Sequence, residues 1–272
     1  MRLMRIFKHV LLILYALTVI YPLFIMIISS FKSQGEIFLH PFSFPKTLML
    51  SNYEIAWTKG HFGVYFWNSV FVSLLSIVLI LFVTSMAAYV LARFHFKGVN
   101  GIVLFFLAGM MLPVRLAILP IFEILKNIHL LNTLWGLIVV YVSIGIPFSV
   151  YLLIDFYRNI PKEIEESAYV DGAGYFQIYL YITLPIMRPA LATVAIFNFI
   201  SIWNDFFFPL VLLRSERLFT LPLGLFNFFG VYGNQWNYLF AGLSLTTVPI
   251  IVAYIILSKQ FIKGLTIGAV KG

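Results

Sequence analysis

The chain has 272 residues, of which 62% are hydrophobic and only 10% are charged, and its mean hydropathy is +1.00. A soluble domain is nearer half apolar and a quarter charged, so this excess indicates a protein whose solvent is lipid. The net charge of +8 forms no dense basic cluster with interleaved aromatic residues, so membrane topology explains it better than nucleic-acid binding does. Cysteine is absent, which excludes disulfides and thiol chemistry.

Six stretches are apolar over the roughly 20 residues that a membrane-spanning helix needs. The first follows the basic start MRLMRIFKH, which resembles a signal peptide. Its apolar run is too long for one and no small-x-small cleavage site follows, so we expect a retained span. We place the spans near residues 10–30, 64–91, 101–122, 133–154, 189–213 and 239–258. This layout predicts an all-α polytopic membrane protein with one transmembrane domain over residues 1–272, kinked where prolines interrupt the spans.

Lysine and arginine gather in the cytoplasmic loops of membrane proteins, so their distribution predicts orientation. With the N-terminus in the cytoplasm, the inner loops hold eleven of these residues and the outer loops six, while Arg115 lies near the outer end of the third span. Both termini are therefore predicted to be cytoplasmic, and so is the segment between the fourth and fifth spans.

That segment interrupts the apolar chain with acidic residues, two glycines and two prolines. Drawn as a helix, it carries one apolar face, with Glu166 on the opposite side. Asp171 falls in the middle of the apolar face, and Asp171-Gly172 is a strong helix-stop signal. We therefore expect two short helices, near 162–170 and 174–183, with a bend between them. The apolar face consists of Ile164, Ala168, Tyr175, Ile178 and Ile182.

Composition alone would fit an interfacial amphipathic connector, but the spacing of the segment is more specific. Glu166-Ser167-Ala168, then Gly172, then the I-x-LP that begins at Ile182 match the "EAA…G…I-x-LP" signature of ABC-transporter permeases, with Ser in place of the first Ala. Three further stretches are similar: HLLNTLWGLIVVY, RLFTLPLGL and KGLTIGAVKG. On these motifs the chain resembles the binding-protein-dependent transport permeases, and within them the maltose-type carbohydrate permeases.

The resemblance implies that the loop at 160–185 is a coupling helix, which docks in a cleft of a separate cytoplasmic ATPase. Glu166 would face the ATPase, and Gly172 would let the two backbones approach closely, since a side chain would hold them apart. The C-terminal tail also reaches the ATPases in that family, which implies contacts for Lys271 and Gly272. The expected coupling residues are Glu166, Ser167, Ala168, Asp171, Gly172 and Ala173.

The resemblance also implies an assembly in the bacterial inner membrane. It would contain this chain, a second related permease, two ATP-binding subunits and an extracytoplasmic solute-binding protein. The loop GVYGNQW resembles the place where maltose-type permeases push a loop into the binding protein, although a loop ordered by its own aromatic residues fits as well. The residues expected to contact the binding protein are Gly230, Tyr232, Gly233, Gln235 and Trp236.

No motif for catalysis is found in the sequence. The Walker pattern G-x-x-x-x-G-K-[ST], H-E-x-x-H and G-x-S-x-G are absent, and the five histidines lack metal-ligand spacing. We therefore expect no enzyme activity, no cofactor and no metal on this chain. The resemblance places ATP and Mg on the partner ATPase subunits.

Asp205 is the one acid placed within a predicted span, and an intramembrane carboxylate is a functional-site hypothesis by default. Near the outer end of the span it suits either an outward-facing cavity or a structural pair with Arg214, and the lack of visible partners favours the structural role. Amide and aromatic side chains suit sugars, yet helix interfaces use similar residues. The candidate substrate-path residues are Asn68, Tyr141, Trp203, Asn204 and Asp205.

The resemblance implies import of a carbohydrate, such as a mono- or oligosaccharide or a sugar derivative, by alternating access driven by ATP hydrolysis on other subunits. Another polar solute is an alternative. A stand-alone secondary transporter would usually need membrane-embedded charges or inverted repeats, and one peripheral acid without an evident repeat argues against it. A non-transporting scaffold would need no coupling signature.

Overall fold

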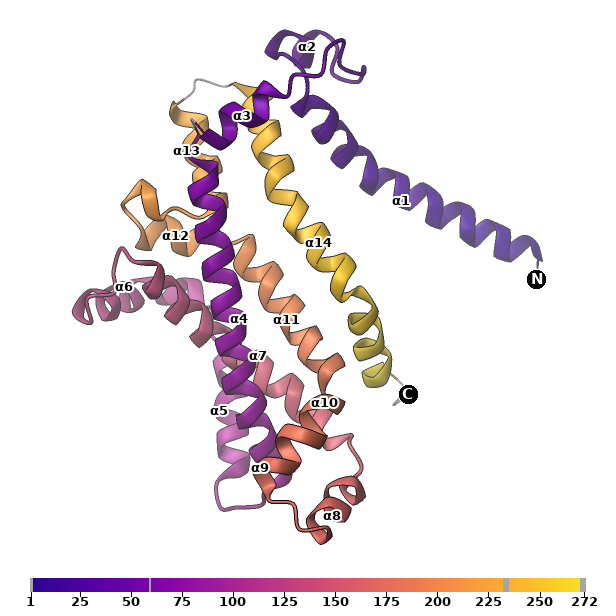
Figure 1. Ribbon diagram of the computed structural model, residues 1–272, viewed down its shortest axis with the longest axis vertical. Coiled ribbons are helices and arrows are strands. Elements are labelled where there is room, and N and C mark those ends of the chain that lie inside the picture. Colours follow the sequence, from indigo (N-terminus) through magenta and orange to yellow (C-terminus); the bar gives the residue numbers. More distant parts are fainter. Residues whose placement is uncertain (1, 59, 232–234, 270–272) are drawn as a thin grey trace. The chain divides into compact units, whose positions relative to one another are not determined.

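The computed structural model describes residues 2–58, 60–231 and 235–269 (Figure 1). This part of the chain is helical and contains no strand, as the sequence predicts. It divides into two compact units. Unit 1 consists of Met1–Phe66 and Phe219–Pro249, and unit 2 consists of Trp67–Leu218 and Ile250–Gly272. Two of the boundaries fall inside long helices, so the division is one of packing rather than of linkers.

Four helices are long and apolar enough to cross a membrane, and the most apolar 18-residue stretch of each has a mean hydropathy between 2.2 and 2.6. Two pairs of shorter helices are long and apolar enough to cross a membrane only when each pair is taken together, and each pair bends sharply at the break between its two helices. The described residues therefore hold six spans when each bent pair counts as one, which is consistent with the six predicted. The four long helices are α1 (Arg2–Ser30), α4 (Phe62–Arg93), α7 (Leu134–Arg158) and α14 (Trp236–Ala269).

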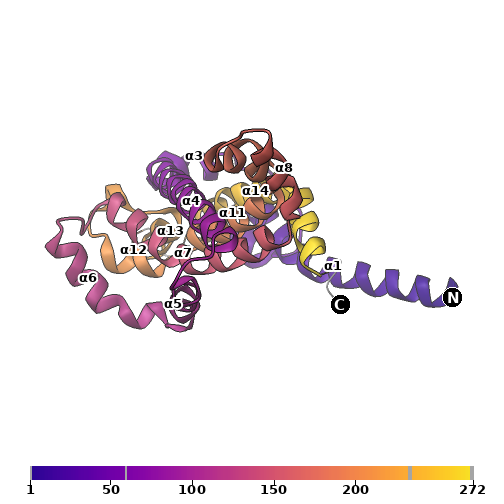
Figure 2. The ribbon, with the colours of Figure 1, turned by 90° about the horizontal axis from the view of Figure 1, so that it is seen from below.

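The third predicted span is a bent pair rather than one straight helix. α5 (Val99–Met111) meets the turn η1 (Val114–Ala117) and α6 (Ile118–Asn127) at 85°, a divergence that Figure 2 shows from below. Pro113 has no N–H to donate and disfavours the helical conformation in Leu112, whose backbone is extended at φ −77° and ψ 127°. The proline that the sequence marks as a kink therefore ends α5.

The fifth predicted span is also interrupted. α11 (Arg188–Trp203) stops before a break at Asn204 and Asp205, and α12 (Phe207–Leu212) starts after it. α11 also meets the segment before it, Tyr175–Ile186, at 72°. The span predicted over 189–213 thus consists of two helices, with Asp205 at their junction.

α7 is the centre of unit 2, because it packs against α5, α11 and α12. Gly145 brings it close to α4 and α11, since a Cβ there would lie 2.5 Å from Cδ1 of Ile80 and 2.6 Å from Oδ1 of Asn198. One turn further along, the Asn198 amide donates to the hydroxyl of Ser149 at 3.1 Å. Small residues and side-chain hydrogen bonds are the means by which membrane helices pack tightly.

In unit 1, buried Asn52 joins three segments of the chain. Its amide donates to the carbonyls of Ser30 and Lys32, at 2.8 and 2.9 Å, and its own carbonyl accepts from the amide of Asn237 at 2.9 Å. By contrast, only 6% of the most apolar stretch of α1 is buried, as expected of a helix whose surface meets lipid or another protein. The shorter helices of this unit are α2 (Gln34–Leu39), α3 (Ser51–Thr58) and α13 (Leu221–Val231).

Candidate functional site

The polar segment between the fourth and fifth spans forms two helices with a bend, as the sequence predicts. α8 spans Lys162–Val170 and α9 spans Tyr175–Ile178. The second predicted helix then changes character, because η2 (Tyr179–Thr183) is a π-helical turn that leads into α10 (Leu184–Ile186). Such turns are rare in proteins, and those that occur are often found at functional sites.

Gly172 ends α8 in a conformation that other residues rarely adopt. Its φ is +90°, and two backbone bonds close the end of the helix around it. The N–H of Gly172 donates to the carbonyl of Tyr169, and the N–H of Ala173 donates to that of Ala168, both at 3.0 Å. This is the Schellman arrangement, which strongly prefers glycine at the left-handed position. Glycine is therefore required here for a local reason, independent of any partner.

The surface around this turn is open. Glu166, Asp171 and Gly172 are exposed, and a Cβ built on Gly172 would meet none of the described atoms within 4 Å. The space above the glycine is therefore available to another molecule. Glu166 is exposed on α8, whereas Ala168 of the same helix is buried.

The apolar face predicted for this segment is only partly buried. Ala168 and Ile178 are buried, but Tyr175 is 56% exposed and Ile164 is exposed as well. Exposed apolar side chains lie at the turn and just after it instead, and Val170 among them is 85% exposed. Patches of this kind mark contact surfaces. The apolar patch consists of Tyr169, Val170, Tyr175, Phe176 and Tyr181.

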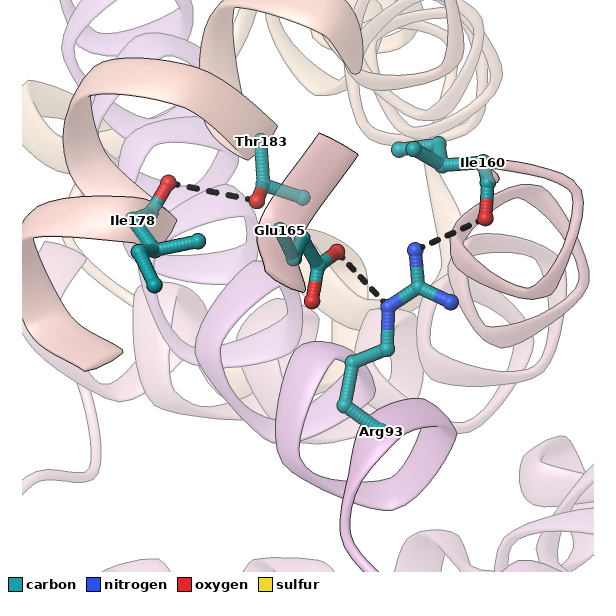
Figure 3. Close-up of polar contacts among 5 residues, drawn as sticks. All are labelled: Arg93, Ile160, Glu165, Ile178 and Thr183. Atoms are coloured by element: carbon teal, nitrogen blue, oxygen red, sulfur yellow. Dashed lines mark hydrogen bonds and ion pairs between the residues drawn. The ribbon is translucent and has the colours of Figure 1, made fainter. Parts of the chain in front are cut away.

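Arg93, at the C-terminal end of α4, holds α8 in place (Figure 3). Its Nε donates to Oε1 of Glu165 at 2.7 Å, and its Nη2 donates to the carbonyl of Ile160 at 3.0 Å. The two charged side chains are only 6% and 14% exposed, and within the described residues theirs is the one ion pair. No sequence pattern joins Glu165 to Arg93, because 72 positions separate them.

A second contact joins the same segment to α4. The hydroxyls of Tyr179 and Ser85 lie 2.8 Å apart and are buried, and the ring of Tyr179 lies 5.2 Å from that of Tyr89. The π turn itself is closed by Thr183, whose hydroxyl donates to the carbonyl of Ile178 at 3.2 Å (Figure 3). The segment is thus fixed to α4 at two separate points.

A cavity of about 520 Å³ lies within unit 2, between α7, α11 and α12. Asp205 lines it, and its Oδ2 accepts a hydrogen bond from the hydroxyl of Tyr141 at 2.8 Å. The same carboxylate accepts the backbone N–H groups of Phe207 and Phe208, at 3.3 and 3.1 Å, and so caps the start of α12. Other lining residues are Arg115, Phe148, Phe197, Asn198 and Ser201.

The structure brings together two of the five residues predicted for the substrate path. Tyr141 and Asp205 share this cavity, whereas Asn68, Trp203 and Asn204 are not among the described residues that line it. Asp205 bonds to a phenol and to backbone N–H groups, and no ion pair with Arg214 forms in the described part of the chain.

The residues left out of the cavity have other surroundings. The Asn68 amide donates to the carbonyl of Arg217 at 2.9 Å, and that of Asn204 donates to Ile200 at 2.8 Å. Trp203 is buried. Asn198 and Arg115, which the structure adds, were visible in the sequence as polar residues of the spans, but nothing in their spacing joins them to Asp205.

The predicted binding-protein loop is described only in part. Gly230 lies in α13, whereas Tyr232 and Gly233 lie outside the described residues, as do Lys271 and Gly272 of the tail. Gln235 is exposed and precedes α14. The N–H of Trp236 donates to the side-chain carbonyl of Gln34 at 2.9 Å, and its ring lies 6.5 Å from that of Phe38 and 6.3 Å from that of Phe240. Contacts within unit 1 therefore order this tryptophan.

We expect Glu165→Gln to loosen α8. Removing one partner of a largely buried ion pair leaves the other charge uncompensated, at a cost of more than about 1.4 kcal/mol, which is tenfold in an opening equilibrium. Backbone amides of α8 should then exchange hydrogen at least tenfold faster. Glu163→Gln removes the same charge from an exposed position of the same helix and should leave exchange unchanged. Equal exchange in both variants would contradict a holding role for Arg93.

Comparisons with known proteins identify the family of the chain. The model of the family described as "Binding-protein-dependent transport system inner membrane component" matches residues 84–266. The chain is 41% identical over 255 residues to the diacetylchitobiose uptake system permease protein NgcG of Streptomyces coelicolor, covering 93% of this chain and 84% of that protein. It is 37% identical to the arabinooligosaccharides transport system permease protein AraQ of Halalkalibacterium halodurans, covering 94% and 93%.

The fold is likewise similar to a known one. A chain in the crystal structure of a bacterial ABC transporter involved in the import of the acidic polysaccharide alginate superposes with a TM-score of 0.85. The two chains are 24% identical, and the match covers 96% of this chain and 97% of the other. The chain belongs to the family of binding-protein-dependent transport system inner membrane components, and it is a multi-pass ABC transporter permease.

Proposed function

We propose that the chain is the permease subunit of a bacterial importer that carries an oligosaccharide or a sugar derivative across the inner membrane. The observation that carries this proposal is the exposed, preformed turn at Gly172 beside Glu166, on a chain that has no ATP-binding motif of its own. The named relatives support the carbohydrate class, since diacetylchitobiose and arabinooligosaccharides are both saccharides. Both termini are proposed to be cytoplasmic.

In this proposal α8 docks against a separate ATPase subunit, which binds ATP and Mg. Glu166 offers an exposed carboxylate to a cation of that subunit, and the apolar patch supplies the area that the contact buries. Ser167, Asp171 and Ala173 flank the turn. This chain then performs no covalent chemistry, and the Arg93–Glu165 pair passes the movement of α8 to α4. The C-terminal residues Lys271 and Gly272 are proposed to meet the same subunit.

On the opposite side of the membrane, the loop that includes Gly230, Tyr232, Gly233 and Gln235 is proposed to meet a solute-binding protein. The exposure of Gln235 supports this. Trp236 is proposed to order the loop rather than to contact the partner, because Gln34, Phe38 and Phe240 already surround it. A second related permease completes the membrane path.

The cavity between α7, α11 and α12 is proposed to meet the substrate on its way. Carboxylate, phenol and amide groups bond hydroxyls, and the rings of Phe148 and Phe197 offer faces for a pyranose. Asp205 thereby has two tasks, since it also caps α12.

Gly172→Asn separates the two reasons for glycine at the turn. Asparagine tolerates a positive φ better than other residues do, so α8 should keep its end, but the new side chain should hold the ATPase away. We expect ATP-dependent uptake in proteoliposomes to fall at least tenfold. Gly174→Asn, two positions along the same exposed loop at φ −74°, is the matched control and should retain uptake. Full uptake by Gly172→Asn would mean that glycine serves the turn alone.

Glu166→Lys should detach the ATPase subunits, because it reverses the exposed charge that faces them. The measurement is the amount of ATPase and second permease that copurifies with the tagged chain in detergent. Glu163→Lys, on the same helix, should copurify both partners like the unmodified chain. Full transport by the chain isolated as a single component would contradict the proposed function as a whole.

Asp205→Asn should raise the apparent KM for uptake roughly tenfold, about the 1.4 kcal/mol of one charge-assisted hydrogen bond, while lowering the melting temperature less than Asp205→Ala does. Asparagine still caps a helix, so α12 persists. Asp205→Ala removes the cap as well and should lower the melting temperature by the equivalent of about 1 kcal/mol. An unchanged KM in Asp205→Asn would mean that the carboxylate stabilises α12 but does not contact the substrate.

A further inference from the structure

A basic cavity of about 710 Å³ lies in unit 2 where α4 ends and α5 begins, beside the last residue of α7 and the first of α8. Among the described residues that line it, none is acidic, whereas four are Lys or Arg. Arg93 is already paired with Glu165. Lys97, Arg158 and Lys162 are exposed and have no carboxylate within 4.0 Å in the described part of the chain. We call these three residues the basic cluster.

The basic cluster favours an anionic ligand. Cations that share a concave surface focus a positive potential there, and in the described part of the chain no carboxylate within 4.0 Å neutralises these three. The ammonium groups of two lysines and the guanidinium of an arginine together match the charge and the acceptor oxygens of a phosphate.

The position of the cavity points to the depth of the lipid headgroups. α4 ends at Arg93, α5 begins at Val99 and α7 ends at Arg158, so three apolar helices change to basic residues around it. Beyond its first turn, α5 exposes large apolar side chains such as Leu104 and Phe105, which suit the hydrocarbon region. The cavity therefore opens where apolar helix surface gives way to water.

The lining itself has two characters. Leu91, Phe94 and Val99 contribute apolar surface, and Phe96, next to Lys97, is 46% exposed. A soluble phosphate would make no use of this apolar surface, whereas a phospholipid places its phosphate among cations and its glycerol and acyl carbons beside apolar side chains. Basic pockets between membrane helices on the cytoplasmic side, which is the side proposed for this cavity, bind acidic headgroups.

We propose that this cavity binds the headgroup of an anionic phospholipid, with Lys97, Arg158 and Lys162 neutralising its phosphate and Phe96 beside the start of an acyl chain. Lys162 is the first residue of α8, so the bound lipid contacts the segment that Arg93 holds from α4. The proposal depends on membrane insertion and not on the transported solute.

The test is native mass spectrometry of the detergent-purified chain together with the subunits that copurify with it. Phosphatidylglycerol and phosphatidylcholine with the same acyl chains are titrated separately. We expect phosphatidylglycerol to bind at a concentration at least tenfold lower than phosphatidylcholine requires. We also expect it to raise the melting temperature of the protein. The variant Lys97→Gln/Arg158→Gln/Lys162→Gln should lose both effects. The control Lys46→Gln/Lys126→Gln/Arg214→Gln removes the same charge from exposed positions elsewhere and should keep both.

Several outcomes would overturn the proposal. They are equal retention of the two lipids by the unmodified chain, an undiminished preference in the cluster variant, and equal loss in the control. Competition by free glycerol phosphate at the concentration of the lipid would assign the site to a soluble phosphate. Loss of ATPase copurification with lipid preference intact would assign the cluster to a protein contact. Should the triple variant fail to fold, Lys97→Gln alone, in the loop before α5, should weaken the preference severalfold.

Discussion

The contact on which the functional surface depends is the one between Arg93 and the segment after α7. A single guanidinium binds both the carboxylate of Glu165 and the carbonyl of Ile160, and it is nearly removed from water. Such a group stabilises a structure only when its charge is compensated, so the ion pair favours the position of α8 that brings Glu165 to Arg93. The Tyr179–Ser85 contact adds a neutral bond to the same helix. α4 thereby carries the segment at two points.

Unit 2 combines this anchored segment with a rigid helix at its centre. α7 packs closely enough on α4 and α11 that Gly145 admits no side chain without displacing Ile80 or Asn198. Close packing transmits displacement because it leaves little room for independent adjustment. A movement imposed on α8 would therefore reach α4 and then α7, which lines the cavity that contains Tyr141 and Asp205. The proposed docking surface and the proposed solute cavity thus lie in the same unit.

The local features of this structure could be predicted from the sequence, but the contacts between residues far apart in the sequence could not. Asp171-Gly172 marks the end of α8, and Pro113 marks the break after α5, because each acts on its own backbone. The Arg93–Glu165 pair and the meeting of Tyr141 with Asp205 join residues 72 and 64 positions apart, so no periodicity reveals them. The exposure of Tyr175 also departed from the helical pattern, because α8 and α9 are separate helices and share no continuous face.

The closure of α8 at Gly172 bears on how tightly this surface can bind. Its two terminal hydrogen bonds are made within the chain, so the turn forms without a partner. Association then costs less conformational entropy, because few backbone angles remain to be fixed. A modest interface can in this way give a durable complex, because little of the binding free energy is needed to order the loop. The remainder is available to drive a conformational change.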